Sequence, residues 1–527
     1  MERMLDVQGK PSPSRRKAAA LAAVGAFAAL GIGIGCAVVN EWTFVAVITA
    51  TVAPFLVAIL LARPTLGLYG LVFMAPYVDV FKTTSLGVTF RFSEIFGAFL
   101  LVVAIMHVLR SGRRLHISIT DVFVLGLLAS MVISVVANLG NEPSQERLRN
   151  IPTAWIGVTG VLDEPAMAIY KKIVHSLVAF AIYFAVNYLA TTWRVWLKAV
   201  KTLIITAMLV CVWALINLVG FMGGMATGLG VRASNVWYAG NAPRITGTLS
   251  EPSYFANFLV LVIPITFFSY ARRRAAIGQA EGVLLGAKWD LIALVLLCVT
   301  LLFTFSGGGW VVFAVQLWLL FAVCLRNNLP MKRFGTMVAA LVFLVVLGLL
   351  AAALFTDMDY ADLAEDNWQK FRGIFEVGVG SGRRVAPDVG WMMFCDHPLF
   401  GVGPGRFSAF EYDYLLNVGF VGEDTPASTF YARIMGELGI LGMAMVIGIF
   451  ASLTWRCFRW ARRARRPTMQ TVLWGAGVGA VTIAVHYLAH ANFWWPYVWV
   501  VFGLANSGIR LTRSSRLDEG ANPGGGE

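Results

Sequence analysis

Long apolar runs separated by short polar gaps repeat along most of the chain. Within each run the apolar residues are continuous and do not alternate with polar ones, which favours helices over the strands of a membrane barrel. A helix needs about 20 apolar residues to cross a hydrocarbon core of about 30 Å. By this criterion the sequence predicts about fourteen membrane-spanning helices, over residues 18–39, 43–62, 66–82, 92–109, 119–138, 169–190, 199–222, 252–270, 289–305, 308–325, 336–356, 426–454, 470–489 and 493–508.

The composition leads to the same class of protein. Hydrophobic residues make up 58% of the 527 residues and charged residues 13%, and the mean hydropathy is +0.72. Because a soluble globular chain is about a quarter charged, so few charges would not keep a folded surface of this size hydrated. We therefore expect an all-α polytopic membrane protein. The six cysteines are scattered without metal-binding spacing, and we expect neither a metal nor a cofactor.

The net charge of +13 is distributed as in a multi-pass membrane protein of the bacterial inner membrane. With the N-terminus inside, every strongly basic gap falls on the cytoplasmic side, as the positive-inside rule requires. These gaps contain Arg63 and residues 110–114, 194–201, 272–288, 326–333, 455–466 and 510–516. Because the basic residues lie in short gaps and form no basic domain, we expect no nucleic acid among the partners.

This topology divides the chain into five parts. Residues 1–17 form a cytoplasmic tail, residues 18–356 hold the first eleven helices, and residues 426–508 hold the last three. Residues 357–425 form one large periplasmic loop, with twelve acidic against five basic residues and a net charge of −7. Residues 509–527 form a Gly-rich cytoplasmic tail that we expect to be disordered.

Two short segments on the outer side carry polar residues that need an explanation. In RITGTLSEPS (residues 244–253), Pro252 can begin a helix and Glu251 complements the positive end of its dipole. Arg244 then either pairs with Glu251 or is presented to an anionic ligand. Ser306 begins the tight turn SGGGW, which either is a simple hairpin turn or binds an anion through its backbone amides.

The large loop contains the densest motif. SGRR at residues 381–384 is followed by WMMFCDHPLFGVGPGRF at residues 391–407, which predicts a helix ending near Asp396 and then a Gly/Pro-rich turn. This run resembles the signature of the O-antigen ligase and polysaccharide polymerase superfamily. RITGTLSEPSYFA (residues 244–256) and FYARIMGELGILG (residues 430–442) resemble the motifs that flank it in that superfamily.

The resemblance implies a metal-independent, inverting glycosyltransferase of GT-C-like architecture. Such enzymes take a glycan from an undecaprenyl-diphosphate carrier and pass it to another lipid-linked glycan, as polymerases, or to lipid A-core, as ligases. By match to the family motifs, Arg244 and Arg383 engage the diphosphate, with Arg384 adjacent. A guanidinium suits this role because its N–H fork binds phosphate oxygens in a bidentate manner.

The chain departs from the family pattern at three positions. Ser428 and Thr429 stand where family members often carry a His-Asn pair, and Gly307 stands where many carry an arginine. A base for the acceptor hydroxyl must then come from elsewhere, and Glu423 and Asp424 are candidates unless they are ordinary loop acids. The further residues expected to contact substrate are Arg384, Glu251, Ser306, Trp391, His397, Arg406, Ser428 and Glu437, and the aromatic side chains suited to sugar stacking include Trp368, Trp391, Tyr412 and Tyr414.

His397, Glu437 and a further pair of histidines have simpler interpretations. His397 is as readily a structural residue of the turn. Glu437 can receive Arg244 or Arg383, or pair across a helix–helix contact. His486 and His490 share a helix face, but with no third ligand nearby we expect a packed pair rather than a metal site.

Three functions remain open at this point. The favoured one is a periplasmic polysaccharide polymerase whose partners are the lipid-linked glycan as donor and acceptor, membrane lipid, a chain-length regulator and a flippase. The first alternative is an O-antigen ligase of the same superfamily. The second is a transporter or flippase of lipid-linked saccharides, which is disfavoured because no paired halves with mid-membrane polar residues are visible.

Overall fold

The computed structural model describes most of the chain beyond the first two predicted helices. The described residues are 58–78, 82–85, 88–111, 116–140, 165–222, 236–239, 242–271, 284–327, 331–332, 334–339, 382–417 and 429–520. Several residues within these ranges are described by their backbone alone, and they include Arg383, Arg384 and Tyr412.

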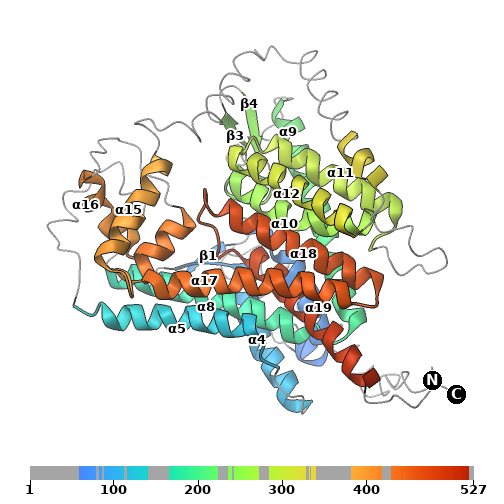
Figure 1. Cartoon of the computed structure of the whole chain (residues 1–527), viewed down its shortest axis with the longest axis horizontal. Coiled ribbons are helices and arrows are strands. Elements are labelled where there is room, and N and C mark those ends of the chain that lie inside the picture. Colours follow the sequence, from blue (N-terminus) through green and yellow to red (C-terminus); the bar gives the residue numbers. More distant parts are fainter. Residues whose placement is uncertain are drawn as a thin grey trace, which may run out of the picture.

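The described chain is a helical bundle with two short hairpins (Figure 1). Its helices are α3 (Pro64–Met74), α4 (Phe92–Arg110), α5 (Ile119–Ala137), α8 (Pro165–Leu189), α9 (Trp193–Met222), α10 (Pro252–Ala271), α11 (Ala287–Phe303), α12 (Gly307–Arg326), α15 (Gly382–Asp396), α16 (Phe407–Asn417), α17 (Phe430–Arg463), α18 (Pro467–His486) and α19 (Pro496–Gly520). The antiparallel hairpins are β1 (Lys82–Ser85) with β2 (Val88–Arg91), and β3 (Val236–Ala239) with β4 (Ala242–Ile245).

Eight of the described helices are long and apolar enough to cross a membrane. They are α4, α5, α8, α9, α10, α12, α17 and α18. This confirms a multi-pass, all-α membrane protein. The total of fourteen helices stays a prediction, since the spans at 18–39 and 43–62 lie wholly or mostly outside the described residues, as does most of 336–356.

The predicted span at residues 66–82 differs from the structure. Its helix, α3, is only 11 residues long and ends at Met74, shortly before Pro76. Pro76 has no backbone N–H, so it cannot continue the hydrogen-bond ladder of the helix. The chain then forms the β1–β2 hairpin, whose sequence KTTSLGVTF is rich in β-branched residues that favour strands.

The disordered tail expected from residue 509 is also wrong for residues 509–520, because α19 continues to Gly520. Side chains beyond residue 509 explain this extension. Arg510 donates hydrogen bonds to the carbonyls of Asn187 and Ala190, at 2.6 and 3.0 Å, and Thr512 is buried. The first turns past the predicted span are therefore anchored to the end of α8.

The centre of the bundle is the contact between α10 and α18. Most of α10 and α18 is buried inside the protein. Gly475 faces the backbone of α10 at Ile265, and a side chain there would overlap that backbone, so the glycine permits the close approach that is typical of membrane helices. Gln316 of α12 ties the pair together by donating to the carbonyl of Val260 (2.6 Å) and to Thr482 Oγ1 (3.2 Å).

The helix α17 runs along much of the bundle and contacts α5, α15, α18 and α19 (Figure 1). Its helical geometry is interrupted once, at Gly439, where φ is 60° and ψ is −154°. The helices α15 and α16 lie beside its first turns, at the left end of the molecule in Figure 1. This end of the molecule contains the sequence motif of residues 391–407.

Candidate functional site

The turn that follows α15 docks on α17 through backbone hydrogen bonds. Val402 N donates to the carbonyl of Gly436 (2.8 Å), and Gly403 N donates to that of Glu437 (3.1 Å). In the opposite direction, Ile440 N donates to the carbonyl of Pro398 (2.8 Å). The break at Gly439 makes this exchange possible, because a continuous helix would use these groups within itself.

Two glycines of the motifs are required by this docking. Gly401 has a φ of 66°, and a side chain there would overlap the backbone of Gly436 and Glu437. Gly439 has a φ of 60°, and its added Cβ would lie 2.6 Å from the carbonyl carbon of Leu399. Left-handed backbone and close approach both favour glycine. The GVGPG turn (residues 401–405) and the GELG segment of α17 (residues 436–439) therefore need these glycines in order to pack against each other.

The end of α5 holds the same turn from another side. Ser134 Oγ donates to the carbonyl of Phe400 (2.6 Å), and Asn138 Nδ2 donates to that of Gly401 (2.9 Å). Arg406, which we predicted to contact substrate, is buried, and its guanidinium donates to the carbonyl of Asn138 (3.4 Å). In this structure Arg406 thus helps to hold the turn.

The docked turn places the Glu437 carboxylate against a lysine of α8. The Nζ of Lys172 lies 3.2 Å from Glu437 Oε2, and the two side chains are 14% and 1% exposed. The Lys172 ammonium also lies 5.4 Å from the ring centre of Trp494. Of the pairings considered for Glu437, the structure thus has the one across a helix–helix contact.

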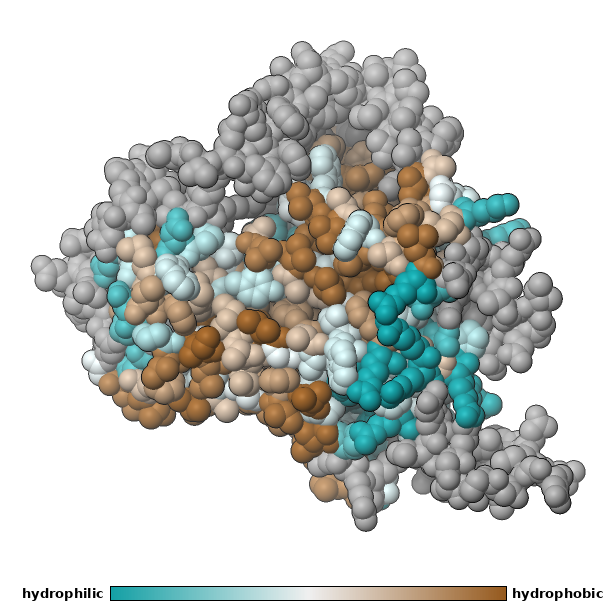
Figure 2. Space-filling view, in the orientation of Figure 1, coloured by the Kyte–Doolittle hydropathy of each residue, from teal (hydrophilic) through white to brown (hydrophobic). Residues whose placement is uncertain are grey.

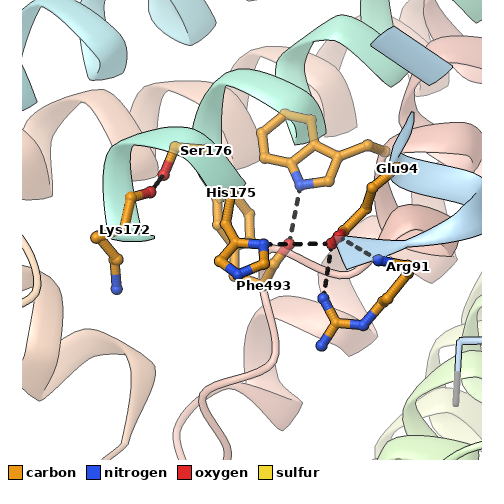
Figure 3. A network of polar contacts seen from close by, with 7 residues as sticks. Arg91, Glu94, Lys172, His175, Ser176 and Phe493 are labelled. Atoms are coloured by element: carbon orange, nitrogen blue, oxygen red, sulfur yellow. Dashed lines mark hydrogen bonds and ion pairs between the residues drawn. The ribbon is translucent and has the colours of Figure 1, made fainter. Parts of the chain in front are cut away.

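One turn after Lys172 on α8, His175 lies beside a second buried carboxylate, Glu94 of α4, which also pairs with Arg91 (Figure 3). The Arg91 guanidinium lies 2.6 Å from Glu94 Oε1, and Arg91 N donates to Glu94 Oε2 (2.9 Å). His175 Nδ1 is 3.5 Å from the same Oε1. The Arg91 guanidinium also lies over Trp495, at 4.7 Å from its ring centre. This network fixes the start of α4 against α8.

Arg433 connects the pair at Glu437 with the loop helix α16. It lies one turn before Glu437 on α17, and its guanidinium is 6.0 Å from the ring centre of Phe407. Its charge acts on Lys172, Tyr254 and Glu411, which come from three other helices. Sequence reasoning missed this residue, although its spacing of four from Glu437 places both on one helix face.

Glu411 is a buried acid of the helix α16. Its side chain lies in α16 and is 3% exposed, and among the described residues its Oε1 has no hydrogen-bond partner. Burial raises the pKa of Glu411 to about 7, while the charge of Arg433 acts in the opposite direction. A carboxyl group with this pKa exchanges a proton near neutral pH, which a general base requires.

Arg244 lies at the turn between α11 and α12. The β3–β4 hairpin places it there, and its Nε donates to the carbonyl of Thr304 (3.1 Å). Ser306 caps α12 by accepting a hydrogen bond from Gly309 N (3.2 Å). The structure therefore brings together Arg244 and the Ser306 turn, which are two of the predicted site elements.

A histidine pair closes this turn on its other side. The rings of His486 and His490 stack with their centres 4.4 Å apart, and both are buried. A Cβ on Gly308 would lie 2.9 Å from His490 Nε2, so the glycine lets the imidazole approach the start of α12. Asn257 Nδ2 donates to His486 Nδ1 (2.8 Å). The two rings are therefore packed against each other. Within the described ranges no group of three metal-ligating side chains occurs.

The segment before α10 forms the predicted capped helix start. The helix begins at Pro252, and the backbone carbonyl of Glu251 accepts hydrogen bonds from the amides of Tyr254 and Phe255, both at 3.1 Å. The Glu251 carboxylate accepts from Ser253 Oγ (3.1 Å). In this structure Glu251 thus contacts the first turn of its own helix.

The remaining predicted residues are placed as follows. Arg383 and Arg384 lie in the first turn of α15, with only their backbone described, and Trp391 lies exposed on the same helix, 5.5 Å from Phe394 between ring centres. His397 directly follows α15, and its carbonyl accepts from Gly401 N (3.0 Å). Glu423, Asp424, Ser428 and Trp368 lie outside the described residues.

Comparison with known protein families supports the class that the motifs indicate. Residues 292–447 match the family model described as O-antigen ligase. This match confirms the resemblance to the O-antigen ligase and polymerase superfamily, whose members transfer glycans. It runs from α11 into α17 and so includes the Ser306 turn, Glu411, the docked turn and Glu437. A search of curated proteins finds no match to the chain.

Proposed function

We propose that the protein is a polysaccharide polymerase of the bacterial inner membrane. It transfers a glycan from an undecaprenyl-diphosphate carrier to a second lipid-linked glycan at the periplasmic face. The observation that carries this proposal is the position of Arg244 beside the turn at residues 304–309. This turn holds both a guanidinium and the start of α12, and both kinds of donor suit a diphosphate.

The remaining cations support an anionic donor at the same end of the bundle. Lys172, Arg91 and Arg433 gather around α17 and the start of α4, and two of them contact a carboxylate. The two paired cations are held in place and nearly neutralised by their carboxylates, so their proposed role is to fix α4, α8 and α17 around the donor rather than to bind the diphosphate directly. Arg383 in the first turn of α15 is proposed as the second arginine at the diphosphate.

The proposed reaction is a direct displacement that requires no metal. The acceptor hydroxyl oxygen forms a bond to the anomeric carbon of the donor sugar, and the bond from that carbon to the diphosphate oxygen breaks. The electron pair leaves with undecaprenyl diphosphate, and the configuration inverts. Glu411 is proposed to take the hydroxyl proton, because among the described acids outside the membrane spans it combines burial with a pKa of about 7.

The start of α17 favours a polymerase over a ligase. Family ligases depend on the histidine of a His-Asn pair, and the corresponding positions here are Ser428 and Thr429. Thr429 is buried and caps α17 by accepting a hydrogen bond from Ala432 N (3.4 Å). The Thr429 side chain is therefore engaged in capping α17. The group that accepts the hydroxyl proton has to come from another element.

A deletion strain tests the proposal directly. We expect it to accumulate single repeat units on undecaprenyl diphosphate at the periplasmic face and to be complemented by the wild-type gene. Accumulation of long lipid-linked chains that fail to reach lipid A-core would instead identify a ligase. Accumulation of repeat units on the cytoplasmic face would identify a flippase.

A further inference from the structure

The C-terminal end of α17 forms a basic cavity remote from the proposed catalytic site. The cavity measures about 470 Å³ and is lined by Arg459, Arg462 and Arg463 together with Trp455 and Phe458. It lies within the hydrophilic patch where α17 gives way to α18 (Figure 2). By the positive-inside pattern this gap faces the cytoplasm.

The arginines of the cavity lie against aromatic rings. Arg459 is over Trp455, with its guanidinium carbon 4.8 Å from the ring centre. Arg462 and Arg463 are over Trp474 and Trp460, at 5.8 and 5.7 Å. A guanidinium that stacks on a ring loses little of its hydrogen-bonding edge, since its N–H groups point outward in the plane. Three positive charges are thus oriented on rigid supports.

An apolar groove meets this cavity at Trp455. The groove measures about 540 Å³ and runs between α17 and α18. Its wall is formed by Tyr431, Ile447, Phe450, Ala451, Thr454, Trp455, Ala480, Val481, Ala484, Val485 and Leu488. Trp455 lines both spaces, so the basic cavity and the apolar groove are adjacent at this side chain.

We propose that the cavity and the groove together bind one acidic phospholipid of the cytoplasmic leaflet. Arg459, Arg462 and Arg463 hold the phosphate of the headgroup, and an acyl chain lies in the groove between α17 and α18. Basic cavities on the cytoplasmic side of membrane helices are suited to anionic headgroups. A zwitterionic lipid would add an ammonium group beside three guanidinium groups, and this repulsion selects against it.

Both parts of the site are needed to define the ligand. A free phosphate would satisfy the arginines but leave the groove without an occupant. A neutral lipid would fill the groove but bring no charge to the arginines. Charge and apolar length together therefore point to a lipid with a net negative headgroup, and this conclusion does not rest on the proposed glycan transfer.

The test uses the full-length protein, purified and delipidated in detergent. Native mass spectrometry measures its binding of phosphatidylglycerol and of phosphatidylcholine with the same acyl chains. The cavity variant is Arg459→Gln/Arg462→Gln. The matched control is Arg110→Gln/Arg326→Gln, which removes two exposed arginines at the ends of α4 and α12. Thermal unfolding checks that each variant is folded.

We expect wild type and control to bind phosphatidylglycerol at least tenfold more tightly than phosphatidylcholine, and the cavity variant to lose that preference. Ala451→Trp, which fills the groove, should weaken phosphatidylglycerol binding while leaving the arginines intact. Equal binding of the two lipids by wild type, or an unchanged preference in the cavity variant, would overturn the proposal. So would inorganic phosphate that binds as tightly as the lipid, or an Ala451→Trp variant with unaltered lipid affinity.

Discussion

The two ends of α17 use positive charge in different ways. Near its start, Lys172 contacts Glu437 and Arg91 contacts Glu94, and both carboxylates are almost fully buried. Near its end, Arg459, Arg462 and Arg463 lie on tryptophan rings. A cation paired with a buried carboxylate is fixed in position and nearly neutralised. A cation on an aromatic face keeps its charge, so it can attract an anion from outside.

Substitution of Arg244 tests whether the end of the molecule near the start of α17 acts on an anionic substrate. We expect Arg244→Ala to lower glycan transfer about 1000-fold, because a donor to a developing charge in a dry site contributes several kcal/mol. Arg244→Lys should also be severely impaired, since an ammonium lacks the bidentate fork. The measurement is transfer from purified undecaprenyl-diphosphate glycan, normalised to protein in the membrane.

The matched control for Arg244 is Arg326→Ala, which removes an exposed arginine at the C-terminus of α12. It should transfer glycan at the wild-type rate. Full activity of Arg244→Ala would remove the diphosphate role from this residue. Arg383→Ala is expected to behave like Arg244→Ala, and a difference between them would separate the two arginines.

Substitution of Lys172 tests whether a cation that is paired with a buried carboxylate supports the fold. Lys172→Met leaves Glu437 as a buried carboxylate without its cation, and we expect this to destabilise the protein by about 4 kcal/mol. The midpoint of thermal unfolding in detergent measures the effect. Lys198→Met, at an exposed position of α9, should leave the midpoint unchanged.

The double variant Lys172→Met/Glu437→Leu sharpens the same comparison. It removes both charges, so most of the lost stability should return. If the double variant is no more stable than Lys172→Met alone, the destabilisation comes from altered packing and not from an unpaired charge.

Gly401 tests the docking of the turn that supports the outer end. Gly401→Ala places a side chain on a left-handed residue and against the carbonyl of Gly436, and we expect a loss of about 2 kcal/mol. Gly220→Ala on α9 is the control, because nothing lies within 4 Å of its added Cβ. That variant should be unchanged or slightly more stable. Equal midpoints for the two variants would argue against a tightly docked turn.

Glu411 is expected to give the smallest effect on stability and a distinctive dependence on pH. Its pKa of about 7 lies above the value of 4.5 for an unperturbed carboxyl group. Between these two pH values the unfolded chain loses the proton while the folded protein keeps it, so stability falls as the pH rises through this window. Above pH of about 7 the loss is complete.

Glu411→Gln should remove that dependence. We expect the variant to match wild type near pH 4, where both side chains are neutral, and to be the more stable protein at pH 8, where only the glutamate has to be buried as a charge. Unfolding midpoints across this range measure it. Identical pH profiles for the two proteins would show that Glu411 titrates normally. Wild-type glycan transfer by the variant would show that another group takes the hydroxyl proton.

The local parts of the fold could be predicted from the sequence. The spans at 92–109 and 119–138 agree closely with α4 and α5, because continuous apolar runs between caps define a helix almost alone. The span at 66–82 was predicted too long because hydropathy alone does not register that a proline, here Pro76, ends a helix. The start of α10 at Pro252 was predicted from local chemistry alone.

The pairing of charges could not be predicted in the same way. Lys172 lies in a predicted span, where an ionisable residue suggests function, but its partner comes from a helix far along the chain. Arg433 and Glu411 likewise interact only because the fold packs α16 against α17. Arg406, which we predicted to contact substrate, is buried and donates a hydrogen bond to the carbonyl of Asn138. No pattern in the sequence distinguishes an arginine that binds substrate from one that holds a turn.

The interruption at Gly439 separates the mechanical roles of the two parts of α17. The upper part is set by the turn after α15, whereas the lower part is the rod that spans the lipid. A membrane of different thickness changes the tilt of such a rod. With a break between the parts, that tilt need not rotate Glu437 away from Lys172, so the contacts at the start of α17 can persist in membranes of varied composition.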